Sequence, residues 1–301
     1  MCAACGGGSG GNTPADSGTP VPDAGLVASP VAPMLTPCPS GWLATTVGEL
    51  TRCEPWAEGL APCTPDTMRV PGEAACVPIG TPCTADDWAD DLPDPAAALY
   101  VRAGAPAGGT GTRDAPFARI SDAVTRAGPG AVVAVAKGRY LANLIISRPV
   151  SLWGACPAET VLEPATASET EPAVGINRSA VELHNLAVSG NRRGVIVTGG
   201  ARDVVLSGVV IDDVVVVGLT VSAGARVTAR DLVVRDTRAS SAGLFGEGIF
   251  VSDADATFER TMLERNHQLA VFAQGVTSVT LTDLVVRDTQ SQPAGGTEGA
   301  R

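Results

Sequence analysis

Short runs of alternating hydrophobic and polar residues recur through the second half of the chain at a nearly constant interval. Five tripeptides align without gaps, and the intervals between their first residues are 23, 23, 29 and 23 residues. A fixed period of this length is typical of repeat architectures, and the interval of 29 is one repeat with six additional residues. The tripeptides are Val181–Leu183, Val204–Leu206, Val227–Ala229, Ala256–Phe258 and Val279–Leu281.

The same register continues beyond these tripeptides. Two further positions recur, five and seven residues after the first residue of each tripeptide. The first position holds Leu186, Val209, Leu232, Thr261 and Leu284. The second holds Val188, Ile211, Val234, Leu263 and Val286. A third alternating segment follows in each of four repeats, at 194–197, 218–221, 248–251 and 270–273. The heptapeptide 231–237 recurs unchanged at 283–289, which makes a chance alignment implausible. Each repeat therefore predicts one coil of three short strands, with successive coils about 4.8 Å apart.

The segment before these repeats predicts a cap. Asp114 can cap a short helix that Gly128 ends, and its apolar face would hold Phe117, Ile120 and Val124. This helix lies between a strand at Tyr100–Val101 and further strands that carry Gly138-Arg139-Tyr140, an order that resembles the N-terminal cap of bacterial pectin-lyase-like proteins. The resemblance implies an all-β fold, a right-handed parallel β-helix of about 23 residues per coil whose open end the helix plugs.

Changes in composition divide the chain into four parts. Residues 1–5 look like the remnant of a lipoprotein signal, and residues 6–37 contain no aromatic residue, Lys or Arg, which predicts a disordered tether. Residues 38–97 predict a small Cys-rich module, and residues 98–301 predict the β-helix. No capping element follows Thr289, so we expect the β-helix to be truncated there or covered by a partner.

Six cysteines of the folded part suit three disulfides. None of them lies in a Cys-x-x-Cys pair, and the two histidines of the chain are far away, so we expect no metal site. Disulfides indicate an oxidising compartment outside the cytoplasm, and the spacing leaves their connectivity open. The six residues are Cys38, Cys53, Cys63, Cys76, Cys83 and Cys156.

The first residues, Cys2-Ala-Ala-Cys5, resemble the end of a bacterial lipoprotein signal, in which Cys5 would be acylated. The apolar and basic segments of such a signal do not precede Cys2, so we expect either that the gene begins further upstream or that this chain is truncated. A Cys-x-x-Cys redox pair is the alternative, but no strand–helix pattern surrounds it. We therefore expect a lipid anchor in a membrane, on the outer membrane or cell surface, and otherwise secretion.

Charge narrows the list of partners. The chain has 32 acidic and 21 basic residues and a formal net charge of −11, which repels a phosphate backbone and argues against nucleic acid. Hydrophobic residues make up 45% and aromatic residues 4%, so the core must consist mainly of Val, Leu, Ile and Ala in thin layers. No apolar run reaches about 18 residues, the length that a transmembrane helix needs.

The catalytic motifs of inverting pectin hydrolases of this fold are largely absent. Only Asp212-Asp213 matches, because no Gly-His-Gly or Arg-x-Lys follows, and we place His184 and His267 in separate turns. A calcium-dependent lyase would need several carboxylates and a basic group on one face. The register does stack Asp212 over Arg235 and Asp213 over Asp236, which makes these four residues weak catalytic candidates. Surface ion pairs between coils explain the same pattern.

A second candidate site is a binding face. Phe250 and Phe272 occupy the outward-facing middle positions of successive coils, and exposed aromatic rings in a row can hold sugar rings. The six additional residues fall in the loop 238–247, where Phe245 could form the wall of a groove or simply cover Phe250. We therefore expect a non-catalytic β-helix that binds or scaffolds, with carbohydrate as its ligand and no cofactor. The alternative is a lyase or hydrolase of acidic polysaccharide, with calcium needed in the lyase case.

Overall fold

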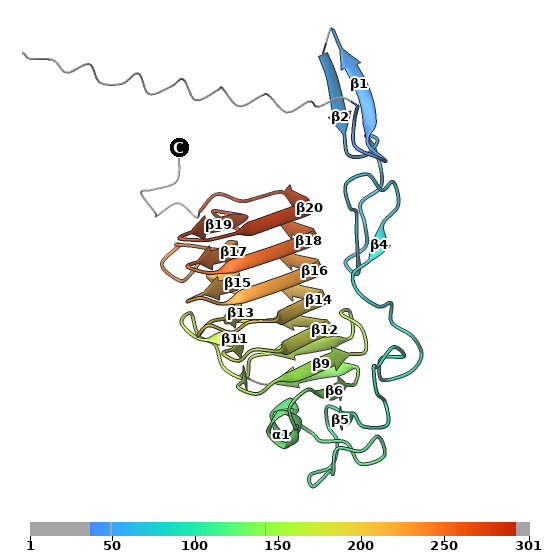
Figure 1. Cartoon of the computed structure of the whole chain (residues 1–301), viewed down its shortest axis with the longest axis vertical. Helices are drawn as coiled ribbons and strands as arrows, with labels where there is room; N and C mark the ends of the chain where they lie inside the picture. Colours follow the sequence, from blue (N-terminus) through green and yellow to red (C-terminus); the bar gives the residue numbers. More distant parts are fainter. Residues whose placement is uncertain (1–36, 49, 142, 293–301) are drawn as a thin grey trace, which may run out of the picture.

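The computed structural model describes residues 37–48, 50–141 and 143–292. Most of these residues form a stack of coils, and the strands of successive coils line up in two parallel sheets (Figure 1). The first sheet has ten strands: β5 (Leu99–Val101), β6 (Ala131–Val135), β7 (Gly138–Leu141), β9 (Val150–Gly154), β10 (Thr160–Glu163), β12 (Val181–Ser189), β14 (Val204–Asp212), β16 (Arg226–Arg235), β18 (Asp255–Glu264) and β20 (Val279–Arg287). The second sheet has six: β8 (Leu144–Ile146), β11 (Pro172–Ile176), β13 (Arg193–Val197), β15 (Val217–Ser222), β17 (Glu247–Ser252) and β19 (Val271–Gln274).

Strand pairing confirms the repeat register. Val204 pairs with Val227, and Leu232 pairs with both Val209 and Thr261, all between parallel neighbours. Every strand of both sheets pairs with its neighbours in parallel. From β11 onward each coil adds one strand to each sheet, whereas in the lower coils the pairs β6 and β7, and β9 and β10, take the place of one long strand of the first sheet. The fold is a right-handed parallel β-helix, as the sequence pattern and the cap motif predict.

The long strands of the first sheet contain two of the three predicted strands of each coil, joined by a bend. One residue at the bend adopts a left-handed backbone conformation, which Asn, Asp and Gly tolerate best. These bend residues stack from coil to coil, with φ between 50° and 62°, and they are Asn185, Gly208, Asp231, Arg260 and Asp283. Arg260 departs from the preferred residue types, and its guanidinium forms ion pairs with Asp231 (2.7 Å) and Glu73 (3.1 Å).

Inward-facing side chains fill the coils in layers. Leu186, Val209 and Leu232 are fully buried at one offset, and the larger Phe258 is fully buried in a higher coil. These residues are mostly Val, Leu, Ile and Ala, which pack densely in the narrow interior of the coils. The few aromatic residues are therefore left largely for the ends and the outer faces of the coils.

The short helix α1 (Ile120–Arg126) covers the N-terminal end of the core, where it buries Ile120, Ala123 and Val124. The prediction that Asp114 caps this helix is wrong, because the helix begins one turn later. Arg119 is at the N-cap position and makes no side-chain capping bond. Near this end Tyr140 donates its hydroxyl to the carbonyl oxygen of Ala136 at 2.8 Å, and burial raises the pKa of Tyr140 to about 12.

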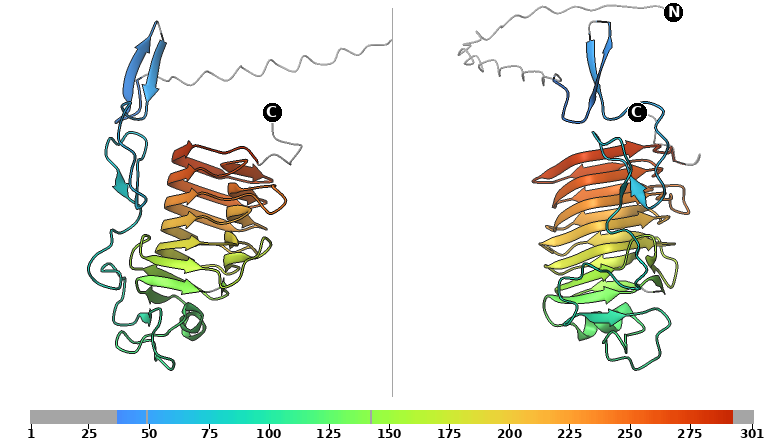
Figure 2. Two further views of the ribbon diagram at one scale, coloured as in Figure 1. Left: turned by 180° about the vertical axis from the view of Figure 1, so that it is seen from behind. Right: turned by 90° about the vertical axis from the view of Figure 1, so that its right-hand side faces the viewer.

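The Cys-rich part forms a strap, residues 64–83, that runs alongside the coils (Figure 2). It holds the short antiparallel strands β3 (Thr67–Met68) and β4 (Val77–Pro78), and a hairpin of β1 (Leu43–Val47) and β2 (Leu50–Glu54) precedes it. Met68, Val70 and Ile79 of the strap bury an outward-facing row of the first sheet. This row consists of Val161, Ala187, Val210, Val233 and Met262.

Polar contacts fix the strap in register with the coils. Asn185 accepts a hydrogen bond from the backbone of Thr81 at 3.0 Å and donates one to its hydroxyl at 2.9 Å. Arg235 donates to the carbonyl oxygen of Pro65 at 2.9 Å. Within residues 37–48, 50–141 and 143–292, no helix has the length and apolar content needed to cross a membrane.

Candidate functional site

All six predicted cysteines form disulfides. The bonds join Cys38 to Cys53, Cys63 to Cys76 and Cys83 to Cys156, so the third ties the strap to the β-helix. In the part of the chain that the structure describes, one group of metal-ligating residue types lies close together, and it consists of Cys83, Cys156 and Glu159. Its two sulfurs are bonded to each other and cannot act as thiolate ligands.

The four weak catalytic candidates lie where two successive coils leave the first sheet. Asp212 pairs with Arg235 in the strand register, and the Arg235 guanidinium donates to Asp212 Oδ2 at 3.0 and 3.1 Å. Asp213 and Asp236 follow in left-handed turns, with φ of 52° and 54°. The register therefore brings these four residues together as the sequence predicts.

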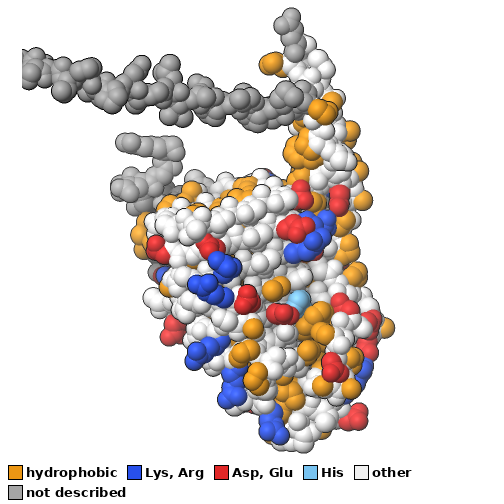
Figure 3. Space-filling model, viewed as in Figure 1, with side chains coloured by type: hydrophobic (Ala, Val, Ile, Leu, Met, Phe, Trp, Pro, Cys, Tyr) orange, Lys and Arg blue, Asp and Glu red, His pale blue; other side chains and the backbone are white. Residues whose placement is uncertain are grey.

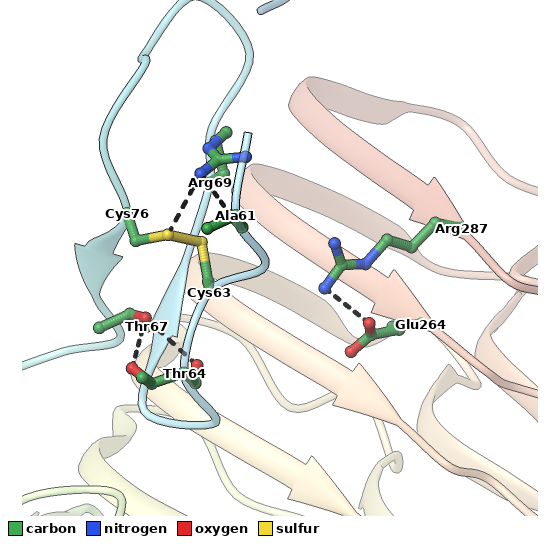
Figure 4. Close-up of a disulfide and its surroundings, with 8 residues drawn as sticks. All are labelled: Ala61, Cys63, Thr64, Thr67, Arg69, Cys76, Glu264 and Arg287. Atoms are coloured by element: carbon green, nitrogen blue, oxygen red, sulfur yellow. Dashed lines mark hydrogen bonds and ion pairs between the residues drawn. A yellow bond between two sulfur atoms is a disulfide. The ribbon is translucent and has the colours of Figure 1, made fainter. Parts of the chain in front are cut away.

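Each of these candidates is held in an ion pair. Asp213 lies 2.7 Å from Arg238, and Arg265 binds both carboxylate oxygens of Asp236, at 2.6 and 2.8 Å. One coil higher the largely buried Glu264 contacts Arg265 at 2.7 Å. It also forms an ion pair with Arg287 at 2.6 Å, which Figure 4 shows. Acidic and basic side chains also lie next to each other on the face seen in Figure 3. This arrangement agrees with a structural role in pairing neighbouring coils.

A cleft of about 400 Å³ lies beside the ion pair of Asp212 and Arg235, between the strap and the first sheet. Pro65 and Asp66 of the strap line one side, while Asp212, Arg235 and Arg139 lie on the β-helix side. Arg139 forms an ion pair with Glu163, and Arg235 is held by Asp212. The arginines on the β-helix side of the cleft are therefore both neutralised by carboxylates of neighbouring coils.

The aromatic pair of the second sheet has the predicted position. Phe250 and Phe272 pair in register, with ring centroids 5.5 Å apart and an angle of 14° between the ring planes. Thr220 and Ile196 continue the same outward row in the two coils below. Both rings are half-buried, so part of each ring stays accessible.

The loop with six additional residues forms one border of this row. Phe250 packs on Val215, Val216 and Val217, which are buried beneath it. Phe245 remains 45% exposed, and Leu244 remains 40% exposed. The loop side chains thus stay at the surface, which agrees with the wall of a groove better than with a lid over Phe250.

A polar column lies next to the aromatic row, and the sequence analysis missed it. In each coil a hydroxyl or amide residue directly follows the last inward-facing residue of the strand. Neighbours touch along the column, since Ser222 donates to Thr198 at 3.2 Å and Gln274 donates to Ser252 at 3.3 Å. The repeat offset could have revealed these residues: Ser147, Asn177, Thr198, Ser222, Ser252 and Gln274.

No protein-family model and no curated protein matches the sequence. Similar solved structures include an alginate lyase from Paenibacillus sp. str. FPU-7, at 15% identity and a TM-score of 0.40, over 57% of this chain and 72% of that chain. Pectin methylesterase PemA from Erwinia chrysanthemi has 19% identity and a TM-score of 0.35, over 54% of this chain and 55% of that chain. The catalytic domain of a GH87 alpha-1,3-glucanase has 15% identity and a TM-score of 0.48, over 69% of this chain and 41% of that chain.

These likenesses concern the parallel β-helix fold alone. This chain spans only about half of the esterase and less than half of the glucanase domain. Function must therefore be argued from the residues of this chain.

One carboxylate near the aromatic row has a shifted pKa. Glu247 begins β17, and its partial burial raises the pKa of its carboxyl group, while the positive charge of Arg193 opposes this shift. The sequence analysis did not single out Glu247 as an acidic group, because burial at a strand end depends on the neighbouring coils.

The prediction that His184 lies in a turn is wrong. His184 belongs to β12, where its ring stacks on Trp153 of the coil below with centroids 4.1 Å apart, and its side chain is only 14% exposed. Its Nε2 atom lies 2.9 Å from Glu182. His267 does lie in a turn, beside the carbonyl oxygen of Thr237, and the two histidines belong to different coils. Cys5 and the tether up to residue 36 lie outside the described residues.

Proposed function

We propose that this protein binds polysaccharide on the exposed face of the second sheet and performs no chemistry on it. The stacked, partly accessible rings of Phe250 and Phe272 carry this proposal. Flat aromatic faces suit the apolar C–H faces of sugar rings. The adjoining column of hydroxyl and amide groups supplies hydrogen-bond donors and acceptors for sugar hydroxyls.

The ion pairs of the weak catalytic candidates favour a binding function over a catalytic one. A lyase or hydrolase needs a carboxylate or a base that is free to exchange a proton with the sugar. Asp212, Asp213 and Asp236 are each paired with an arginine of the same or a neighbouring coil. The binding function proposed here requires neither calcium nor any other cofactor.

Export is the second part of the proposal. Three disulfides favour an oxidising compartment outside the cytoplasm. The Cys2-Ala-Ala-Cys5 sequence supports acylation of Cys5 and a lipid anchor on the outer membrane or the cell surface. Mass spectrometry of the N-terminal peptide from native membranes tests this anchor.

Replacing Phe272 by Ala should weaken polysaccharide binding about tenfold, because the variant loses the apolar contact of one ring. Phe272 is preferred to Phe250, whose ring also packs on the buried valines. The matched control is Thr257→Ala, an exposed position on the first sheet that should leave affinity unchanged. Affinity electrophoresis in gels containing soluble polysaccharides measures both. An unchanged affinity of F272A for every retarding polysaccharide would contradict the proposed site.

A further inference from the structure

The upper end of the coil stack is open in the part of the chain that the structure describes. β20 pairs with β18 alone, and β19 pairs with β17 alone, so each of these strands ends its sheet. Both strands lie at the same end of the molecule, at the top of the coils in Figure 1. No described strand binds the backbone N–H and C=O groups along these two edges, and such an edge is a template for another strand.

The side chains at this end occupy inward-facing positions and are nevertheless exposed. Leu281 follows Phe258 in one inward column, and its exposed fraction is 42% where that of Phe258 is 0%. Val286 follows Leu263 in another inward column, with exposed fractions of 46% and 1%. The top coil therefore presents an apolar layer that a matching surface would bury.

The lower end of the stack is closed, which limits how copies of the chain can meet. α1 covers the core there and buries Ile120, Ala123 and Val124. The open end of one copy therefore finds no open end at the bottom of another, which argues against a head-to-tail filament. Only like ends fit each other, and such an isologous contact has a two-fold axis and closes at two chains.

The top coil is self-complementary about such an axis. The bend at Asp283, with φ of 52°, divides β20 into two arms, and β19 of the second sheet closes the coil on its other side. A two-fold axis through the bend and the middle of β19 exchanges the two arms between copies, so that facing strands run antiparallel. Leu281 of one copy then opposes Leu284 of the other. Val279 opposes Val286 in the same way, so inward-facing apolar residues meet one another.

The hairpin of β1 and β2 supplies a second contact. It projects past β20 on the side of the strap (Figure 1), and Leu43 and Leu50 are 44% and 76% exposed. A two-stranded hairpin alone is only marginally stable in water. The strap covers the outer face of one arm of the first sheet, where Val285 is half-buried, and leaves the other arm free, with Thr280 and Thr282 exposed. Exchange of the arms brings the hairpin of one copy beside the free arm of the other.

We propose that two copies of this chain form an end-to-end dimer through the upper edges of β20 and β19. The dimer buries Leu281 and Val286, pairs the backbone groups of both edges and gives each hairpin a sheet face on which to pack. Because the axis crosses β19, the second sheets of the two copies lie on the same side of the dimer, and their outward rows join into one longer face. The dimer does not depend on the proposed binding of polysaccharide.

Sedimentation equilibrium of the full chain measures its mass in solution. We expect twice the 30.3 kDa of one chain at protein concentrations of about 10 to 100 µM. The variant L281D/V286D places two carboxylates of each copy in the contact and should sediment as one chain. L141D is the matched control, because Leu141 is 73% exposed in the lower coils, and this variant should stay dimeric. Circular dichroism of both variants verifies that the lower coils remain folded.

A cysteine near the axis tests the contact without changing the apolar layer. Thr282 of one copy faces Asp283 of the other in this arrangement, so the two Thr282 Cα atoms lie about 6 Å apart, within the range of a disulfide. With Cys2 and Cys5 replaced by Ser, T282C should form a covalent dimer on oxidation. T228C is the control, because Thr228 is exposed two coils lower and should form no such dimer.

A single-chain mass for the wild type would leave this end of the stack to a different protein and would overturn the inference. A mass above two chains, an unchanged mass of a folded L281D/V286D or the absence of a covalent dimer in T282C would also overturn it. If L281D/V286D fails to fold, the comparison of T282C with T228C decides.

Discussion

Replacing Leu232 by Asp is expected to unfold the β-helix in one cooperative transition at ordinary temperature. Leu232 is fully buried between Val209 and Thr261 of the neighbouring coils. The new carboxylate would be buried without a partner, and the leucine contacts would also be lost. Such changes cost more than about 4 kcal/mol of unfolding free energy, and coils stabilise one another only through their neighbours.

Thr228→Asp is the control for this substitution. Thr228 lies on the same strand, β16, but its side chain is exposed on the outer face. The variant should change the unfolding free energy by less than about 0.5 kcal/mol. Thermal melting followed by circular dichroism distinguishes the two variants. A native melting transition in L232D would refute the inward register of this strand.

Removing the disulfide between Cys83 and Cys156 should cost about 4 kcal/mol of unfolding free energy, because its two cysteines are 73 residues apart. The bond restricts the unfolded chain between the strap and the first coils. The native contacts of the strap with Val210 and Val233 also depend on its attachment. This cost should exceed that of removing Cys63–Cys76, whose separation of 13 residues predicts about 3 kcal/mol.

The double variants C83S/C156S and C63S/C76S should be compared by urea unfolding under identical conditions. Tryptophan fluorescence reports on the strap through Trp42, which lies beside Gly72, and on the lower coils through Trp88 and Trp153. A smaller loss of stability for C83S/C156S than for C63S/C76S would contradict the conclusion that the Cys83–Cys156 disulfide holds the strap against the β-helix. Coincidence of fluorescence and circular dichroism would show that the strap and the coils unfold together.

The fold could be predicted in detail because the repeat is strict. A two-residue alternation within a 23-residue period leaves few registers that bury Leu186, Val209 and Leu232 together. Once these residues are assigned to one buried layer, the period determines how the strands of the later coils pair. The helix was harder to place, since Asp114 offers a capping side chain while the hydrophobic contacts of Ile120 and Val124 decide where the helix begins.

The position of the strap on the first sheet could not be predicted from the sequence. Val210 and Val233 face outward, although they are as apolar as their inward neighbours. Such a row needs a cover, and composition alone does not identify the cover as Met68, Val70 and Ile79. His184 was misplaced for a related reason, because its stacking on Trp153 depends on a coil that precedes the regular repeats.

The candidate sites were predictable to different degrees. Phe250 and Phe272 follow from alternation within their strands, so their stacking was predicted correctly. The ion pairs of Asp213 with Arg238 and of Asp236 with Arg265 involve turns whose conformation the period does not determine.

The most direct test is a glycan-array screen of the purified full chain with calcium present, which reads both retained binding and the release of unsaturated sugar products. The proposed function predicts binding to one or more polysaccharides without any product. Unsaturated product would instead establish a lyase and make Asp212, Asp213, Arg235 and Asp236 the first residues to mutate. The absence of any bound polysaccharide would contradict the binding face on the second sheet.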